Sequence, residues 1–309
     1  MKIKQLLIAM ACTTMLAACS PQSGDAGKED AAKEAAPKDA ASETAAPAPE
    51  TEAAAPEAAA EAPDLGSVIA GPQRTEEYAA RDQYRHPQQT LEFFGIEPGM
   101  TVVEIAPGGG WYTEILAPYL REEGTFYAAH FPEGTDSDYY QRSLAGFKKK
   151  VAADKASYGA LQRTEFDPAS GATVAPAGSA DAVLTFRNVH NWMRGENEQK
   201  AFNQFFAALK PGGVLGVVEH RAKPGTSRED MIESGYVTQE HVIEVAEKAG
   251  FELEDTSEIN ANPKDTADHP KGVWTLPPTL RLGDQDREKY LAIGESDRMT
   301  LRFRKPAAE

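Results

Sequence analysis

The stretch VVEIAPGGGWYTEILAPYL, residues 102 to 120, contains the pattern that decides the fold. A β-branched run is followed by three consecutive glycines and then by a segment with the apolar spacing of a helix. Glycine has no Cβ, so such a turn lets backbone N–H groups approach a small molecule closely at the start of a helix. The stretch therefore predicts a strand, a glycine turn and a helix, and it makes binding of a nucleotide-type cofactor the first hypothesis.

The rest of residues 65 to 309 alternates between strand-like and helix-like segments. Alternation of this kind predicts a mainly parallel sheet with helices on both faces. No helix is expected between the last two strands, so the last strand should be antiparallel. The predicted class is α/β, with three layers and seven strands. Strands are expected at 101–106, 124–130, 161–166, 181–186, 214–219, 251–259 and 299–304, and helices at 76–94, 111–120, 138–153, 196–209 and 239–249.

The N-terminus has the pattern of an export signal: Lys2 and Lys4, a short apolar run, and Leu16-Ala17-Ala18-Cys19. This end resembles the lipobox of bacterial lipoproteins, in which the cysteine becomes the first mature residue and carries lipid. The resemblance implies a signal peptide at 1–18 and lipidation at Cys19. The implied location is the bacterial cell envelope. Ser20, rather than Asp, follows Cys19, and by the same resemblance this implies the periplasmic face of the outer membrane rather than retention at the inner membrane. An ordinary secretory signal with a chance cysteine is the alternative.

Residues 19 to 64 are expected to form a disordered linker. From Ser20 onward they are rich in Ala, Glu, Pro, Lys and Ser, lack aromatic residues, and contain 11 acidic residues against 3 lysines, half of the formal charge of -16. We interpret the segment as a tether, with a protein-binding tail as the alternative. The acidic balance argues against nucleic acid as a partner. The chain has 2 cysteines, Cys12 and Cys19, so the domain at 65–309 offers no thiolate or disulfide.

Residues 76 to 309 resemble the class I S-adenosylmethionine-dependent methyltransferases. The first motif of that family is an acid followed by glycines at alternate positions, and here Glu104 takes the acid place. PGGGWYTEILAP and FRNVHNW are also similar to an exported subgroup of predicted methyltransferases. The resemblance implies a Rossmann-like sheet of seven strands and S-adenosylmethionine as the cofactor. The turn residues implied to bind it are Glu104, Ala106, Pro107, Gly108, Gly109 and Gly110.

Two further cofactor contacts follow from the same resemblance. The family usually places an acid at the end of the second strand to bind the ribose, whereas this chain has His130, which could bond one hydroxyl. Ala106 in a glycine place and Pro107 are smaller departures. Asp167 follows the third strand, where the family contacts the adenine amino group. A turn-starting Asp before Pro168 is the alternative for that residue.

The segment FRNVHNWM, residues 186 to 193, follows the fourth strand, where an open α/β sheet has its ligand crevice. His190 is the predicted general base, and Asn188 and Asn191 are predicted to orient an acceptor. A structural role for these three residues is the alternative. His190, Glu219 and His220 offer the nitrogen and oxygen atoms of a facial metal site. No local spacing typical of metal ligands supports that interpretation, so no metal is expected.

The leading function is methyl transfer to an unknown small-molecule or envelope acceptor. The alternative is a non-enzymatic ligand-binding lipoprotein on a degenerate methyltransferase scaffold, because an exported protein lies outside the compartment where the cofactor is made. A hydrolase is a weaker third hypothesis, since no serine nucleophile motif is present. Residues 260 to 298 form a long polar insertion, interpreted as a lid, a binding loop or a cover for the sheet edge.

Overall fold

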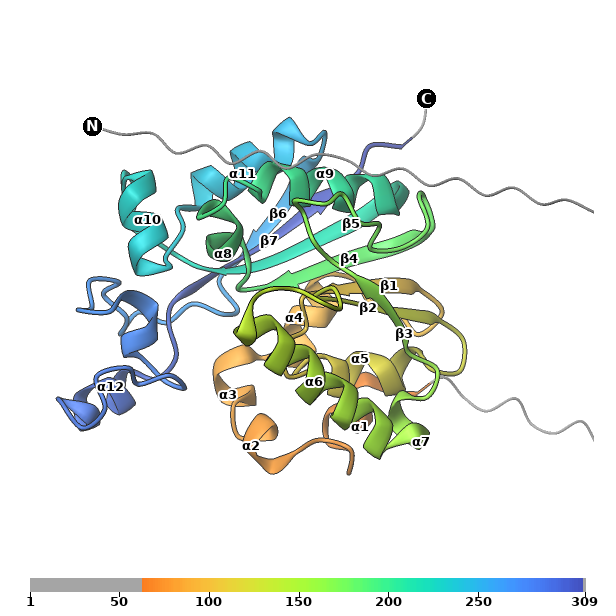
Figure 1. The fold of residues 1–309 in the computed structure, drawn as a ribbon, viewed down its shortest axis with the longest axis horizontal. Helices are drawn as coiled ribbons and strands as arrows, with labels where there is room; N and C mark the ends of the chain where they lie inside the picture. The colour runs from red at the N-terminus through yellow and green to blue at the C-terminus, as the bar shows by residue number, and fades with distance from the viewer. Residues whose placement is uncertain (1–62, 308–309) are drawn as a thin grey trace, which may run out of the picture. The chain divides into compact units, whose positions relative to one another are not determined.

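The computed structural model describes residues 63–307; the predicted signal peptide, Cys19 and nearly all of the linker lie outside them. Within this range the strands form one seven-stranded sheet in the order β3-β2-β1-β4-β5-β7-β6 (Figure 1). Neighbours from β3 to β5 are parallel, and β7 is antiparallel to both β5 and β6. The predicted fold class is confirmed. The bounds are β1 Thr101–Ile105, β2 Thr125–His130, β3 Gln162–Glu165, β4 Ala180–Phe186, β5 Leu209–His220, β6 Glu252–Ser257 and β7 Arg298–Arg304.

Helices cover both faces of the sheet because the central strands are apolar on both sides. In β1, Val102 packs into one hydrophobic cluster and Val103 into the other. On one face lie α1 Leu65–Ile69, α4 Pro87–Phe93, α5 Thr113–Leu120, α6 Asp138–Ala153 and α7 Lys155–Tyr158. On the other lie α8 Val189–Met193, α9 Glu198–Ala208, α10 Arg228–Ser234 and α11 Gln239–Lys248 (Figure 1).

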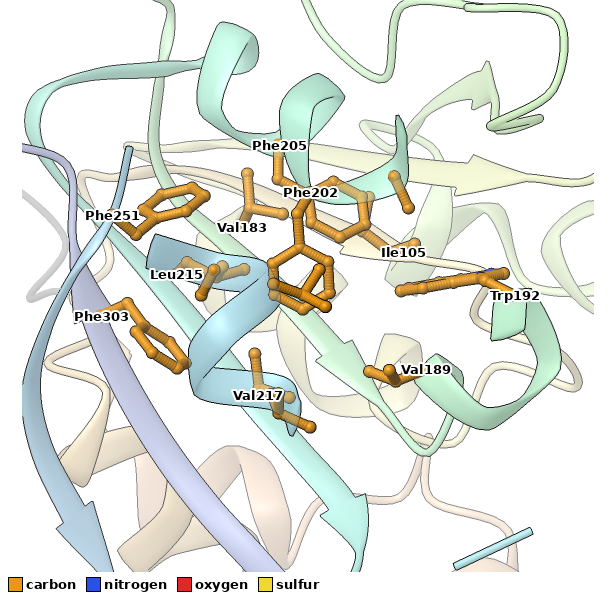
Figure 2. Close-up of a cluster of buried hydrophobic side chains, with 14 of the residues drawn as sticks. Ile105, Val183, Val189, Trp192, Phe202, Phe205, Leu215, Val217, Phe251 and Phe303 are labelled. Atoms are coloured by element: carbon orange, nitrogen blue, oxygen red, sulfur yellow. The ribbon is translucent and has the colours of Figure 1, made fainter. Parts of the chain in front are cut away.

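The second of these faces holds the larger of the two hydrophobic clusters. Phe202 and Phe205 of α9 pack against strand residues that include Val183 and Leu215, and Trp192 of α8 closes the cluster (Figure 2). The rings of Trp192 and Phe205 meet edge to face, with centroids 5.6 Å apart and an interplanar angle of 61°. This packing fixes α8 against the end of β4, and α8 carries His190.

The segment 76–94 was expected to be one helix, and that expectation is wrong. It forms α2 Glu76–Ala79, α3 Asp82–Arg85 and then α4. His86 has φ of 40° and lies in the left-handed region, and Pro87 begins α4. Proline disfavours the α conformation in the residue before it, so the chain turns at His86. The break separates α3, which carries Arg85, from the helix that packs on the sheet.

The insertion between β6 and β7 is partly helical, with a 3₁₀ turn η1 at Gly272–Thr275 and α12 at Arg287–Ile293. The short helices α1, α7, α8 and α10 were also not predicted, because they span only 4 to 7 residues each. None of the helices within residues 63–307 is both long and apolar enough to cross a membrane.

Candidate functional site

A cavity of about 770 Å³ opens at the carboxyl ends of β1, β4 and β5, next to the point where the strand order reverses between β1 and β4. A second cavity of about 610 Å³ adjoins it. Four residues line both cavities, which are therefore neighbours: Phe131, Tyr140, Asn191 and Trp192. The larger cavity is lined by α2, α3, the glycine turn, the β4–α8 turn, the end of β5 and the insertion at 260–298.

The glycine turn presents one open position to the larger cavity. Gly108 has φ of 60°, and a Cβ there would have no atom within 4 Å. A Cβ at Gly109 would collide with the hydroxyl of Tyr78, which donates a hydrogen bond to the Gly109 carbonyl over 3.2 Å. Ala106 adopts φ of 47° despite its methyl group and lines the cavity with Pro107. The turn therefore approaches a ligand most closely at Gly108.

Gly110, which was predicted to contact a cofactor, has a packing role in the structure. Its φ is 82°, and a Cβ there would lie 3.3 Å from Phe147 and from Thr113. It does not line the cavity. Glycine at this position permits packing of the turn against α5 and α6, so its predicted contact with a cofactor has no counterpart in this geometry.

Glu104 lies at the base of the cavity with an exposed fraction of 3%. Its Oε2 accepts a hydrogen bond from the Thr113 hydroxyl over 2.6 Å. Burial raises the pKa of Glu104 to about 7, against the smaller opposing effects of that hydrogen bond and of Arg187. A ligand cation in the cavity would favour the charged form, so this carboxyl group suits an ammonium partner.

The raised pKa predicts a pH-dependent stability. Between the ordinary pKa of 4.5 and about 7, the folded carboxyl keeps its proton while the unfolded one loses it. Stability is therefore lost as pH rises through this range, by roughly 3 kcal/mol in all. Glu104→Gln removes this titration. In urea melts, the free energy of unfolding of the variant relative to wild type should therefore be higher at pH 8 than at pH 4 by about this amount. The exposed Glu247→Gln is the control, and parallel curves for Glu104→Gln would contradict the pKa shift.

His130 is fully buried at the end of β2 and does not line either cavity. The Phe131 N–H donates to its Nδ1 over 2.8 Å, so Nε2 carries the proton and donates to the Gly108 carbonyl over 3.0 Å. Both ring nitrogens are occupied by the chain. The predicted bond to a ribose hydroxyl therefore has no donor or acceptor here. His130 instead holds the glycine turn against β2.

Asp167 lines the second cavity with Phe166 and Pro168. Its Oδ1 accepts a hydrogen bond from the Ala169 N–H over 3.0 Å, which is the turn-starting role considered as the alternative. The two roles are compatible, because one carboxylate has two oxygens. Asp167 lines the second cavity, whereas the glycine turn lines the larger one.

His190 and Glu219 form a buried dyad at the wall of the larger cavity. His190 is 7% exposed, and its Nδ1 lies 3.1 Å from Oε1 of Glu219. The carboxylate also accepts N–H groups from Val189 over 2.6 Å and from His220 over 2.8 Å. Because Nδ1–H donates to this fixed carboxylate, Nε2 is the ring nitrogen that can accept a proton. This is the arrangement of an oriented general base.

The two asparagines differ in placement. Asn188 donates from Nδ2 to the Ile105 carbonyl over 3.1 Å and to the Thr185 hydroxyl over 3.2 Å, so it ties the ends of β1 and β4 together. Asn191 is exposed and lines both cavities. Asn191 is therefore the better placed of the two to contact an acceptor, and Asn188 keeps the turn in position.

The three possible metal ligands also lie together, with one ligand atom each from His190, Glu219 and His220 within 4.8 Å of one another. These residues have no local ligand spacing along the chain, because the pairing of β4 with β5 brings them together. Glu219 is already an acceptor for two backbone N–H groups and for His190. These contacts favour a role for the Glu219 carboxylate in orienting His190 rather than in binding a metal.

Sequence reasoning did not foresee the convergence of basic residues in this cavity. Arg81 and Arg85 lie in the segment that was expected to be one helix, and Arg298 lies at the end of the insertion. The structure brings these three together with Arg187 along the cavity wall. The signal was present as scattered arginines, but their meeting depends on the path of the 260–298 insertion.

Comparisons with known proteins agree on the fold. No family model matches the chain, and no curated protein does. A SAM-dependent methyltransferase from Aquifex aeolicus is 16% identical with a TM-score of 0.50, over 78% of this chain and 98% of that one. A candidate sarcosine dimethylglycine methyltransferase from Galdieria sulphuraria is 12% identical with a TM-score of 0.52, over 75% and 88%.

A third structure is phosphoethanolamine N-methyltransferase 2 from Haemonchus contortus, in complex with S-adenosyl-L-methionine. It is 16% identical with a TM-score of 0.50, over 79% of this chain and 60% of that one. At these identities the likeness establishes the fold alone. The chain has the fold of class I S-adenosylmethionine-dependent methyltransferases.

Proposed function

We propose that the protein transfers a methyl group from S-adenosylmethionine to a small-molecule acceptor. The observation that carries this proposal is that two features meet at one cavity: the open glycine turn at Gly108 after β1, and the His190–Glu219 dyad at the neighbouring ends of β4 and β5. Fold does not fix function, so the weight rests on these residues.

The residues fit the cofactor at three points. The open space beside Gly108 admits a ligand against the backbone. Glu104 would face the amino group of the methionine part, and Asp167 lies in the adjoining cavity where the adenine end would reach. When bound, the sulfonium group supplies an electrophilic methyl group. The fit is weakest for the ribose, because His130 offers no free ring nitrogen.

His190 would remove the proton of the acceptor. Its Nε2 would accept the proton of an acceptor N–H or O–H as that atom takes the methyl group, and the electron pair of the broken carbon–sulfur bond would stay on the sulfur. Glu219 stabilises the resulting imidazolium through Nδ1–H without itself taking a proton. Asn191 and Trp192 would position the acceptor beside this base. Catalysis by such an arrangement consists mainly of positioning and base assistance.

Transfer of a radiolabelled methyl group to an extract of envelope small molecules and lipids tests the activity. The full chain should produce a labelled product that depends on S-adenosylmethionine. If the protein bound S-adenosylhomocysteine but gave no product with any extract, the non-enzymatic ligand-binding alternative would replace the transfer reaction.

We also propose that lipid on Cys19 anchors the protein at the periplasmic face of the outer membrane. The support is the sequence Leu16-Ala17-Ala18-Cys19 after an apolar run, which lies outside the described residues. Cys19→Ala should move the protein from the membrane fraction to the soluble fraction after cell fractionation. Retention of the variant in the membrane fraction at wild-type levels would contradict the anchor.

A further inference from the structure

Five arginines line one cavity; one of them, Arg281, lies over the Trp274 ring, and the other four, from separate parts of the chain, are Arg81, Arg85, Arg187 and Arg298. One carboxylate, that of Glu295, lies among them. Arg81 Nε donates to its Oε1 over 2.6 Å, and Arg85 Nε donates to its Oε2 over 3.3 Å. Arg298 pairs with the same Oε2. This carboxylate joins the carboxyl-terminal end of the insertion to α3 and to the residue before it.

The positive charge of this cluster exceeds its negative charge. Among the described residues, no acidic side chain forms an ion pair with Arg187. Arg85 and Arg298 are only 4% and 2% exposed, and Nε of Arg298 has no hydrogen-bond partner. Burial, and after it repulsion from neighbouring arginines, lowers the pKa of Arg187 to about 10 and that of Arg85 well below its usual range. Unpaired buried charge is costly, so the arrangement needs a counter-ion.

We infer that these arginines form an anion-binding subsite that holds a carboxylate or phosphate group of the methyl acceptor, an assignment of the acceptor that rests on the proposed function. Arg187 lies on the β4–α8 turn, three positions before His190. Arg298 lies two positions after Ser296, whose Oγ is 2.6 Å from His220 Nδ1. The anion would therefore be held on the wall that carries the proposed base. Guanidinium groups match carboxylate and phosphate oxygens with paired N–H donors.

The cofactor alone does not balance this charge. S-adenosylmethionine brings one carboxylate, but it also brings an ammonium and a sulfonium group, so its net charge is positive. Its binding would add to the excess in the cavity. Arg85 lies close to the residue that follows the glycine turn, with its guanidinium carbon 4.7 Å from the centre of the Trp111 ring, so a cofactor carboxylate at that turn would compete for Arg85. Substitution of Arg187 is therefore a better test of a separate acceptor anion than substitution of Arg85.

The test titrates inorganic phosphate into the full chain at constant ionic strength and follows the melting temperature. Wild type should melt at higher temperature as phosphate rises. Arg187→Gln should weaken the apparent phosphate affinity by about tenfold or more, the cost of a lost charged hydrogen bond. Without phosphate, the same variant should melt about 2–4 °C above wild type, because repulsion is relieved. Arg142→Gln, an exposed arginine on α6, is the matched control and should change neither value.

Arg187→Lys keeps the charge and should retain phosphate binding, and Arg81→Gln serves as a second variant if Arg187→Gln does not fold. Equal phosphate affinity in wild type and folded Arg187→Gln would overturn the subsite. Repeating the titration with saturating S-adenosylhomocysteine separates the two anions. Retained phosphate binding supports an acceptor subsite, whereas displacement would assign the cluster to the cofactor carboxylate and overturn the inference. Arg187-dependent phosphate binding without any S-adenosylhomocysteine binding would support the anion site while the proposed function fails.

Discussion

Replacing His190 with alanine is expected to lower the rate of methyl transfer by about 10²–10⁴-fold, the range for general acid–base groups. The reason is geometric: Glu219 holds Nδ1 at 3.1 Å and leaves Nε2 as the nitrogen that can take the acceptor proton. Affinity for S-adenosylhomocysteine should change little, because the glycine turn and Glu104 carry that contact. The measurement is turnover of labelled methyl groups beside calorimetry of the same preparations.

The control for this substitution is His241→Ala, on α11 outside both cavities. It should keep wild-type turnover and should correct for any general loss of stability. Glu219→Gln should lower turnover less than His190→Ala and alter its pH profile, because the imidazolium loses its charged partner. Wild-type turnover by folded His190→Ala would remove His190 from the mechanism.

Gly108→Val should reduce affinity for S-adenosylhomocysteine by about 10²-fold or more, on the order of 3 kcal/mol. A branched side chain would occupy the open space that the backbone leaves for the ligand. The positive φ of Gly108 adds a strain of about 1–2 kcal/mol, so a moderate fall in melting temperature is also expected. Circular dichroism should show a folded protein.

Gly225→Val is the matched control for Gly108→Val. Gly225 has φ of 79° and equally open surroundings, but it lies outside both cavities. It should share the strain and keep the affinity. Equal affinity of Gly108→Val and Gly225→Val would place the ligand site elsewhere. Gly110→Val is not a clean test, since its Cβ meets Phe147 and Thr113 and the variant would lose stability for packing reasons.

The alternation of strands and helices along the chain followed from periodicity, because apolar runs and helix stops are local signals. The strand at 181–186 and the helix at 138–153 agree with β4 and α6 almost to the residue. The expectation of a single helix at 76–94 was wrong because it rested on apolar spacing and did not take account of the effect of Pro87 on His86. Here the proline restricted the preceding residue and turned the chain.

The candidate site was predictable only where it depends on strand ends. His190 and Glu219 were placed near one another by topology, and the structure brings them into contact. The burial of His130 was not predictable, since its ring partners are the carbonyl of Gly108 and a backbone N–H that sequence patterns do not reveal. The arginine cluster depends on a long insertion whose path no periodicity describes.

Isothermal titration calorimetry of the full chain with S-adenosylhomocysteine tests the central claim most directly, because it asks whether the cavity binds this cofactor class at all. The account predicts binding of one ligand per chain with a dissociation constant between about 1 µM and 1 mM, the range usual for enzyme substrates. Gly108→Val should weaken this binding by about 10²-fold or more, and Gly225→Val should keep it. No measurable heat and no rise in melting temperature for wild type at millimolar ligand would contradict the methyltransferase account.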